Sequence, residues 1–283
     1  MQKKEKIGAL LEGIVDTFTN NNKVIVLINS IIFVSTPILI ILKHRFGIRS
    51  TNLLITMSVF SFLFSVWVSK NLYFRLPKSN LNVKNKIMNF LIYYVFFPLS
   101  APVFIAAIVN LIGGMFVKNE NPQGLTALAS NEVIYSLFTD IIAGAEEIWR
   151  YSSIFIIYLI FTFCFRRFSK SKGTKIALLI SSFLISSFIF GWLHTFSYSN
   201  GWINLDITVT IGLMGLCFSL VMFITKRIWC AILTHSMFDA YTTLKLYNAD
   251  IVLLILALTY ISIATVWICT IIRNTKDKTT INS

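Results

Sequence analysis

The sequence has few of the residues that keep a protein soluble. Only 13% of its 283 residues are charged, whereas 56% are hydrophobic. Apolar runs long enough to cross the bilayer core as helices, roughly 20 residues each, recur about eight times along the chain. These runs do not alternate polar and apolar residues, which excludes a transmembrane β-barrel. The composition predicts an all-α, polytopic transmembrane helical bundle of about eight spans.

Acidic residues and cysteines are also scarce. Against 25 Lys and Arg there are 12 Asp and Glu, which gives a net charge of +13. The basic residues lie mainly in the connections between apolar runs, where they set membrane orientation and contact anionic lipid headgroups, so we expect no nucleic-acid partner. The four cysteines lie in or beside apolar runs without CxxC spacing, which favours small buried hydrophobes over disulfides or zinc ligands: Cys164, Cys217, Cys230 and Cys269.

Residues 3–18 differ from the apolar runs that follow them. They carry an apolar stripe at helical spacing, with lysines and acidic residues away from the stripe. This pattern predicts an amphipathic helix lying on the membrane surface, with docking to a partner as an alternative. No short apolar core followed by a small-residue cleavage site is present, so the pattern indicates no removable signal peptide.

Eight apolar spans are expected after this helix, and two prolines predict a kink or break in the third. Basic connections at 70–86, 166–175 and 226–227, together with the basic tail, are assigned to the cytoplasm by the positive-inside rule, which places both termini inside. The basic connector at 43–49 then falls outside and departs from that rule. The spans are 24–42, 53–68, 87–117, 133–165, 176–194, 207–224, 228–244 and 251–272.

The fourth span contains adjacent carboxylates, Glu146 and Glu147, followed by Arg150. On a helix either acid can meet the guanidinium, because residues three and four apart share a face. Ionisable groups at membrane depth are costly and tend to be retained where they are used. We expect Arg150 to neutralise one acid and leave the other free. Asp140 precedes Glu146 by six residues, nearly opposite it on a helix, and is left outside this cluster.

Two of the three histidines lie in apolar spans, His194 in Phe190-Gly-Trp-Leu-His194 and His235 in His235-Ser-Met-Phe-Asp239. Phe190 and Asp239 are each one helical turn from a histidine, so Phe190 offers an apolar wall and Asp239 can hold or polarise a nearby group. In general, burial brings a carboxylate pKa closer to the range a general base needs. Histidines can bind the attacking water or stabilise an oxyanion. The cluster predicts peptide-bond hydrolysis in a membrane cavity.

Taken in order, these motifs resemble the signatures of a known family, the CAAX protease and bacteriocin-processing (CPBP, or Abi) family of intramembrane glutamic proteases. Its signatures are a Glu-Glu pair followed by Arg, then FxxxH, then HxxxN or HxxxD. Each motif is weak alone, whereas three in order and in apolar spans are a strong signal. The matching residues here are Glu146-Glu147…Arg150, Phe190…His194 and His235…Asp239.

The resemblance implies a role for each matched residue. Glu146 would activate a water molecule with help from His194. His235 and Asp239 would form the oxyanion side of the site. Arg150 would orient the glutamate pair. We expect no cofactor, with zinc as a less favoured alternative.

One spacing departs from the family. The family places three residues between the second Glu and the Arg, and here only two intervene. If Arg150 is aligned with the Arg of the family motif, Glu146 takes the place of the second acid and the main catalytic acid is missing. If the two glutamates are aligned with the family's Glu pair instead, Arg150 is displaced by about 100° around the helix. We favour the second interpretation, because the small residues at 143–145 allow backbone adjustment, and Glu147 stays open as the working acid.

The resemblance also divides the chain. It covers residues 130–245, which we interpret as the CPBP-like catalytic helical core. The other parts are an amphipathic interfacial helix at 1–22, N-terminal transmembrane helices at 23–129, and a last transmembrane helix with a basic tail at 246–283.

Alternatives stay open at this point. Zinc held by His194, His235 and a glutamate would leave an open catalytic position, although HExxH spacing is absent. A CPBP-like membrane partner that does not cleave, acting in regulation or bacteriocin immunity, is a second class. A proton-coupled transporter is a third, disfavoured because paired repeats with broken helices are missing. For a peptidase, the expected partners are the bilayer and a peptide or small membrane protein, and the composition favours a bacterial peptide.

Overall fold

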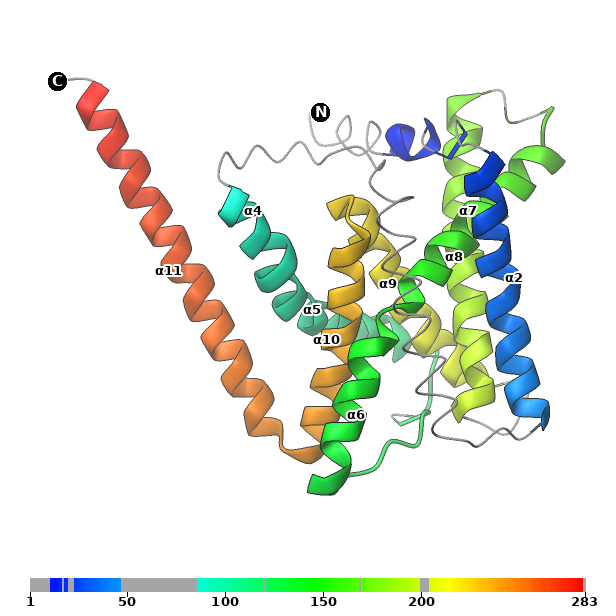
Figure 1. The fold of residues 1–283 in the computed structure, drawn as a ribbon, viewed down its shortest axis with the longest axis horizontal. Helices are drawn as coiled ribbons and strands as arrows, with labels where there is room; N and C mark the ends of the chain where they lie inside the picture. The colour runs from blue at the N-terminus through cyan, green and yellow to red at the C-terminus, as the bar shows by residue number, and fades with distance from the viewer. Residues whose placement is uncertain are drawn as a thin grey trace.

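The computed structural model describes residues 11–16, 18–19, 23–46, 86–119, 121–167, 169, 171–198 and 204–281. Every secondary-structure element in these ranges is a helix, as the composition predicts (Figure 1). The elements in chain order are α2 (Lys23–Phe46), α4 (Lys86–Leu91), the π-helix η2 (Ile92–Phe96), α5 (Phe97–Gly113), α6 (Ser130–Ala143), α7 (Glu146–Cys164), α8 (Lys172–Tyr198), α9 (Leu205–Thr225), α10 (Ile228–Tyr247) and α11 (Ala249–Ile281).

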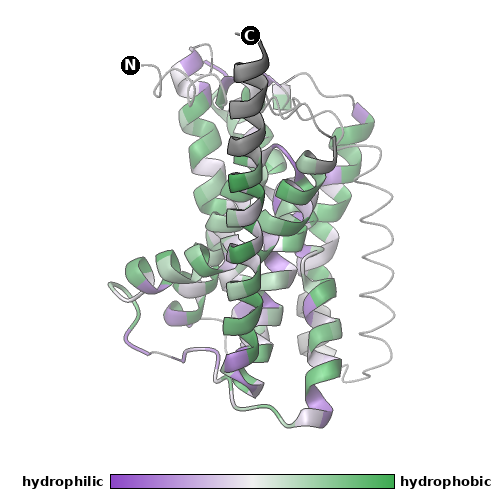
Figure 2. Cartoon of the chain, turned by 90° about the vertical axis from the view of Figure 1, so that its left-hand side faces the viewer, coloured by the Kyte–Doolittle hydropathy of each residue, from purple (hydrophilic) through white to green (hydrophobic). Residues whose placement is uncertain are grey.

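Five helical stretches are long and apolar enough to cross a membrane, which marks a membrane-embedded protein. They correspond to five of the eight predicted spans, and Figure 2 shows hydrophobic residues along most of their length. The first predicted span contains a shorter apolar helix in α2, and the span predicted at 53–68 lies outside the described residues. The seventh corresponds to α10, which is too polar to be one of the five. The five are Ile92–Gly113, Ser130–Cys164, Lys172–Tyr198, Leu205–Thr225 and Ala249–Cys269.

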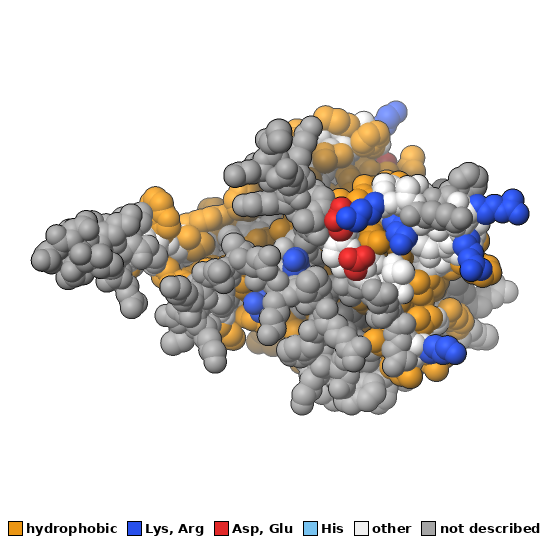
Figure 3. Space-filling view, turned by 90° about the horizontal axis from the view of Figure 1, so that it is seen from above, with side chains coloured by type: hydrophobic (Ala, Val, Ile, Leu, Met, Phe, Trp, Pro, Cys, Tyr) orange, Lys and Arg blue, Asp and Glu red, His pale blue; other side chains and the backbone are white. Residues whose placement is uncertain are grey.

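Helices α7 to α10 form the centre of the bundle. α8 packs along both α7 and α9, α10 packs against α5, α6 and α9, and α2 covers α7 from outside. The connection from α7 to α8, the connection from α9 to α10 and the end of α11 lie at one end of the molecule (Figure 1). Figure 3 looks onto this end and shows Lys and Arg side chains on it. The described parts of the basic connections at 166–175 and 226–227 therefore lie at the same end of the molecule.

The N-terminal helical turns at 11–16 and 18–19 pack into the protein. Phe18 is fully buried, and its ring lies 5.1 Å from that of Phe155 and 5.7 Å from that of Tyr151, both on α7. Ile14 and Val15 are buried in the same cluster. In the described half of the predicted amphipathic stripe, the apolar side chains therefore face the bundle, where aromatic rings of α7 cover Phe18. Residues 3–10 of the stripe lie outside the described residues, and its place on the membrane surface stays a prediction.

The predicted irregularity in the third span is present. The chain passes from α4 through one π-helical turn, η2, before it continues as α5. Pro98 lies in the first turn of α5, directly after η2, and Pro102 lies inside the helix, so both remove a backbone donor from this run. Figure 1 shows that α5 turns away from the direction of α4 and passes behind α10.

The fourth predicted span, expected as one run, is broken where its small residues lie. α6 ends at Ala143 and α7 begins at Glu146. Gly144 touches α10 so closely that a Cβ atom there would overlap the carbonyl oxygen of Ile232 and the hydroxyl of Ser236. The Ser236 hydroxyl also donates to a carbonyl oxygen near the end of α6, at 2.8 Å. This contact fixes the break against α10 and makes Glu146 the first residue of a new helix.

Candidate functional site

The buried part of the site is an ion pair between Glu147 and Arg150. A guanidinium nitrogen, Nη2, lies 2.9 Å from Oε1 of Glu147, and both side chains are fully buried. The guanidinium also lies over the ring of Phe190, with its central carbon 3.7 Å from the ring centroid. Such a pair offsets the cost of burying two charges only while both partners remain. The predicted neutralisation of one acid is present, and the neutralised acid is Glu147.

Space for this guanidinium comes from a glycine on α9. A Cβ atom built at Gly215 would overlap Nη1 of Arg150 and approach the ring of Phe190 to 3.0 Å. Any side chain at Gly215 would therefore displace the Arg150 guanidinium. Gly215 thus contributes to the site without a functional group of its own.

His235 joins Glu147 to the open part of the site. Its Nδ1–H donates to Oε1 of Glu147 at 2.8 Å, and its other ring nitrogen, Nε2, lies 3.4 Å from a carboxylate oxygen of Asp239. The ring of Phe218 stacks on the imidazole with centroids 4.4 Å apart and planes 13° from parallel. A histidine held at both nitrogens and on one face has a fixed orientation.

Glu146 and His194 form the open part of the site. Oε2 of Glu146 lies 3.6 Å from Nε2 of His194, and the two side chains are 42% and 21% exposed. The Nδ1–H of His194 donates to the carbonyl oxygen of Phe190 at 2.8 Å, which turns Nε2 towards Glu146. The separation is slightly too long for a direct hydrogen bond, yet one water molecule can contact both atoms. This is the arrangement in which a carboxylate can take a proton from water.

Helix α8 extends past its predicted end, and this brings the two histidines together. The span was expected to end at His194, whereas the helix continues to Tyr198. His194 therefore lies one turn inside the helix, and it lines the same cavity as His235. The rings of both histidines contact Phe190, with centroids 4.4 Å and 6.4 Å from its ring.

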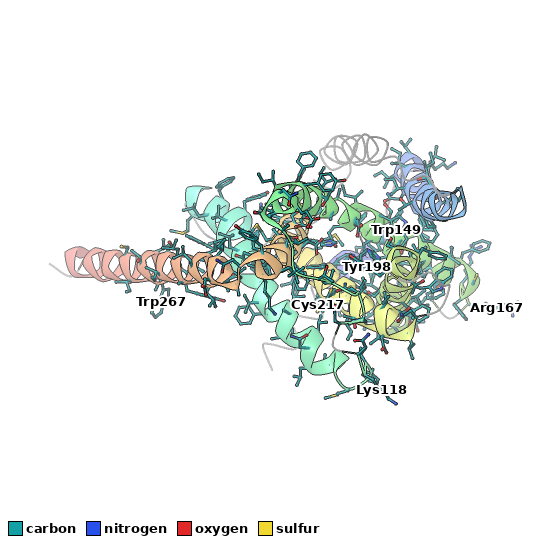
Figure 4. All side chains as sticks on the ribbon, turned by 90° about the horizontal axis from the view of Figure 1, so that it is seen from below. Lys118, Trp149, Arg167, Tyr198, Cys217 and Trp267 are labelled. Carbon is teal, nitrogen blue, oxygen red and sulfur yellow. The ribbon has the colours of Figure 1, made fainter. Side chains whose placement is uncertain are left out.

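A cavity of about 240 Å³ connects these residues. It lies nearer the end opposite the basic connections, since Gln123 precedes α6 and Tyr198 ends α8. Figure 4 views this end from below and labels Tyr198 between α8 and the centre of the bundle. Residues from the α5–α6 connection and from α6, α7, α8, α9 and α10 line it: Gln123, Thr139, Asp140, Ala143, Glu146, Phe190, His194, Tyr198, Ile211, Met214, Phe218, His235 and Asp239.

Asp140 corrects one prediction. On one continuous helix Asp140 would lie nearly opposite Glu146 and outside the cluster. It lines the same cavity as Glu146. The reason is the break at Gly144 and Ala145: α6 and α7 are separate helices, so the angular relation across six residues of one helix does not apply.

Several residues of the site carried no signal in the sequence. Phe218 on α9 holds the His235 ring, Gly215 leaves room for Arg150, and Tyr198 lines the cavity beside His194. Aromatic residues and glycines are common in membrane helices, so none of the three stands out by type or spacing.

The two acids of the first motif differ in their partners. Arg150 pairs with Glu147 three residues earlier, so the glutamates keep adjacent places with one acid paired and one facing the cavity. Within the described ranges, no three His, Cys, Asp or Glu side chains converge as a metal-binding group.

Comparison of the chain with protein-family models, curated proteins and solved structures gives no match. Fold and site define a helical membrane protein with a polar cavity.

Proposed function

We propose that the chain is an intramembrane endopeptidase of the CPBP type, which hydrolyses a peptide or small membrane protein. The observation that carries the proposal is the Glu146–His194 pair at 3.6 Å on the wall of the cavity. A carboxylate and an imidazole at this separation, open to water, can act together as general base and proton carrier.

The reaction needs only water and the peptide. Glu146 accepts one proton from a water molecule as the water oxygen bonds to the carbonyl carbon of the substrate. His194 holds the same water and passes protons between Glu146 and the substrate. The tetrahedral intermediate then loses its C–N bond, and the proton taken by Glu146 moves to the leaving nitrogen. The products are a carboxylic acid and an amine.

The developing oxyanion needs a hydrogen-bond donor that is already oriented. His235 is suited to this role, because Glu147 holds its Nδ1 and the ring lines the cavity. Asp239 lies 3.4 Å from Nε2 and favours a proton on that nitrogen. Arg150 keeps Glu147 in place, and so acts on His235 through Glu147.

The test compares the peptides released by cells that carry the native chain or Glu146→Gln at matched membrane levels. Glu147 is left unchanged in this experiment, because its buried pair supports the fold. Asp250→Asn serves as the control, since this exposed acid begins α11 and does not line the cavity. Peptides that are cleaved in native and Asp250→Asn cells, and intact in Glu146→Gln cells, are the expected result.

Identical peptide profiles in all three strains would contradict the peptidase proposal. If loss of the whole chain still changed the cells, the non-cleaving partner would take its place. Repeating the cleavage with a metal chelator separates the water-only mechanism from the zinc alternative: we expect the same rate with and without chelator.

A further inference from the structure

The charged side chains on the cavity wall are mostly acidic. Among the described residues, three carboxylates line it, Asp140 from α6, Glu146 from α7 and Asp239 from α10, whereas no Lys or Arg does and His235, beside Asp239, supplies the basic contribution. This is notable in a chain whose net charge is +13. The nearest guanidinium described, that of Arg150, is fully buried and paired with Glu147, so it does not reach the cavity.

The three carboxylates also act on the same space. All three line it together with the Tyr198 side chain at the end of α8. Like charges brought together on walls of low dielectric concentrate the local field and attract a cation.

The rest of the wall is apolar. Phe190 and three side chains of α9 form it: Ile211, Met214 and Phe218. An apolar wall beside an acidic one matches a long aliphatic stem that ends in a positive charge, as in lysine or arginine. A cavity of about 240 Å³ holds one such side chain with its adjoining backbone, and is smaller than pockets for drug-sized ligands, which begin at about 300 Å³.

We infer that the cavity selects peptides with a lysine or arginine side chain next to the bond to be cleaved, and that Asp140 is the residue that determines this specificity. The inference rests on the proposed function for its cleavage step. Asp140 is assigned the specificity role because Glu146 is engaged with His194 and Asp239 with His235.

The first test uses the purified full chain in lipid nanodiscs and a synthetic library of ten-residue peptides, with cut positions read by mass spectrometry. We expect Lys and Arg to be enriched about tenfold within two positions of the cut, as one unscreened charge pair allows. Asp140→Asn should reduce this enrichment severalfold, Asp140→Glu should retain it, and Asp250→Asn should leave it unchanged. Cleavage without basic enrichment, or with equal enrichment in Asp140→Asn, would overturn the inference and leave the peptidase proposal standing.

The second test needs no cleavage. Fluorescein-labelled peptides of leucine and alanine, with Lys, Met or Glu at the centre, are titrated against the same nanodiscs by fluorescence anisotropy. We expect the Lys peptide to bind about tenfold more tightly than the Met peptide, and the Glu peptide to bind most weakly. If the Lys preference is present and sensitive to Asp140→Asn while no library peptide is cut, charge selection holds and the peptidase proposal fails. Equal affinity for the three peptides would overturn the inference.

Discussion

Glu146 and Glu147 are neighbours in the chain and opposites in environment. Glu147 is fully buried and bonded to both Arg150 and His235. Glu146 is 42% exposed, lines the cavity and faces His194 across 3.6 Å without a direct hydrogen bond. The Glu146 carboxylate is therefore free to exchange protons, whereas the Glu147 carboxylate fixes the positions of Arg150 and His235.

The difference follows from where α7 begins. Consecutive residues point about 100° apart around a helix, so only one of two neighbours can face a given wall. The close contact of Gly144 with α10 ends α6 and makes Glu146 the first residue of α7. Glu146 then faces the cavity, and Glu147 faces the interior of the bundle.

Replacing the open acid should have the largest effect on catalysis. For any peptide that the protein cleaves, Glu146→Gln should lower kcat by a factor of about 10³, within the range for removal of a general base, because glutamine cannot accept the proton. The thermal unfolding midpoint in detergent should match that of the native chain, since Glu146 has no buried partner. A variant that unfolds early but still cleaves would reverse the roles assigned to the two acids.

Breaking the buried pair should have the largest effect on stability. Arg150→Met leaves Glu147 buried without its guanidinium, which we expect to cost about 3–5 kcal/mol in the free energy of unfolding. The double variant Glu147→Gln, Arg150→Met should recover part of this loss, because no charge then stays unpaired. Unfolding by denaturant in mixed micelles measures both.

A surface pair serves as the control for this stability measurement. Lys172 and Glu12 lie 2.7 Å apart, but the lysine side chain is 72% exposed. Lys172→Met should therefore change stability by less than about 1 kcal/mol. Equal losses for Lys172→Met and Arg150→Met would show that burial is not what distinguishes the two pairs.

Filling the space beside Arg150 should have a smaller effect. Gly215→Ala should destabilise the protein by about 1–3 kcal/mol through overpacking, and should lower kcat because the displaced guanidinium no longer holds Glu147. Gly173→Ala is the matched control, since no atom lies within 4 Å of the added Cβ. An unfolding midpoint and kcat unchanged by Gly215→Ala would remove Gly215 from the site.

The smallest effect is expected at the stacked ring. Phe218→Leu keeps an apolar side chain against His235 and removes the stacking, worth about 0.5–1.5 kcal/mol. The His235 ring then keeps its bonds to Glu147 and Asp239 but loses support on one face. Steady-state kinetics with one peptide measure the effect: we expect a severalfold lower kcat, and an unchanged kcat would remove the stacked ring from the site.

The sequence was sufficient for the parts of the fold that depend on composition and local spacing. Long apolar runs predicted the helices, and the three-residue spacing predicted the pair with Arg150. It was insufficient where helices cross. The cavity position of Asp140 depends on a break held by α10, and the N-terminal stripe is covered by rings more than 130 residues away in the chain. Such contacts leave no periodic trace in a single sequence.

The contrast between α10 and α11 bears on how the protein enters the membrane. The most apolar window of α11 is only 6% buried by the protein, so this helix is stable in lipid by its own hydrophobicity. α10 has too many polar residues to be one of the five helices suited to cross a membrane by themselves. It needs α5, α6 and α9 around it. The site around His235 is therefore complete only when these neighbours have packed around α10, whereas α11 does not depend on them.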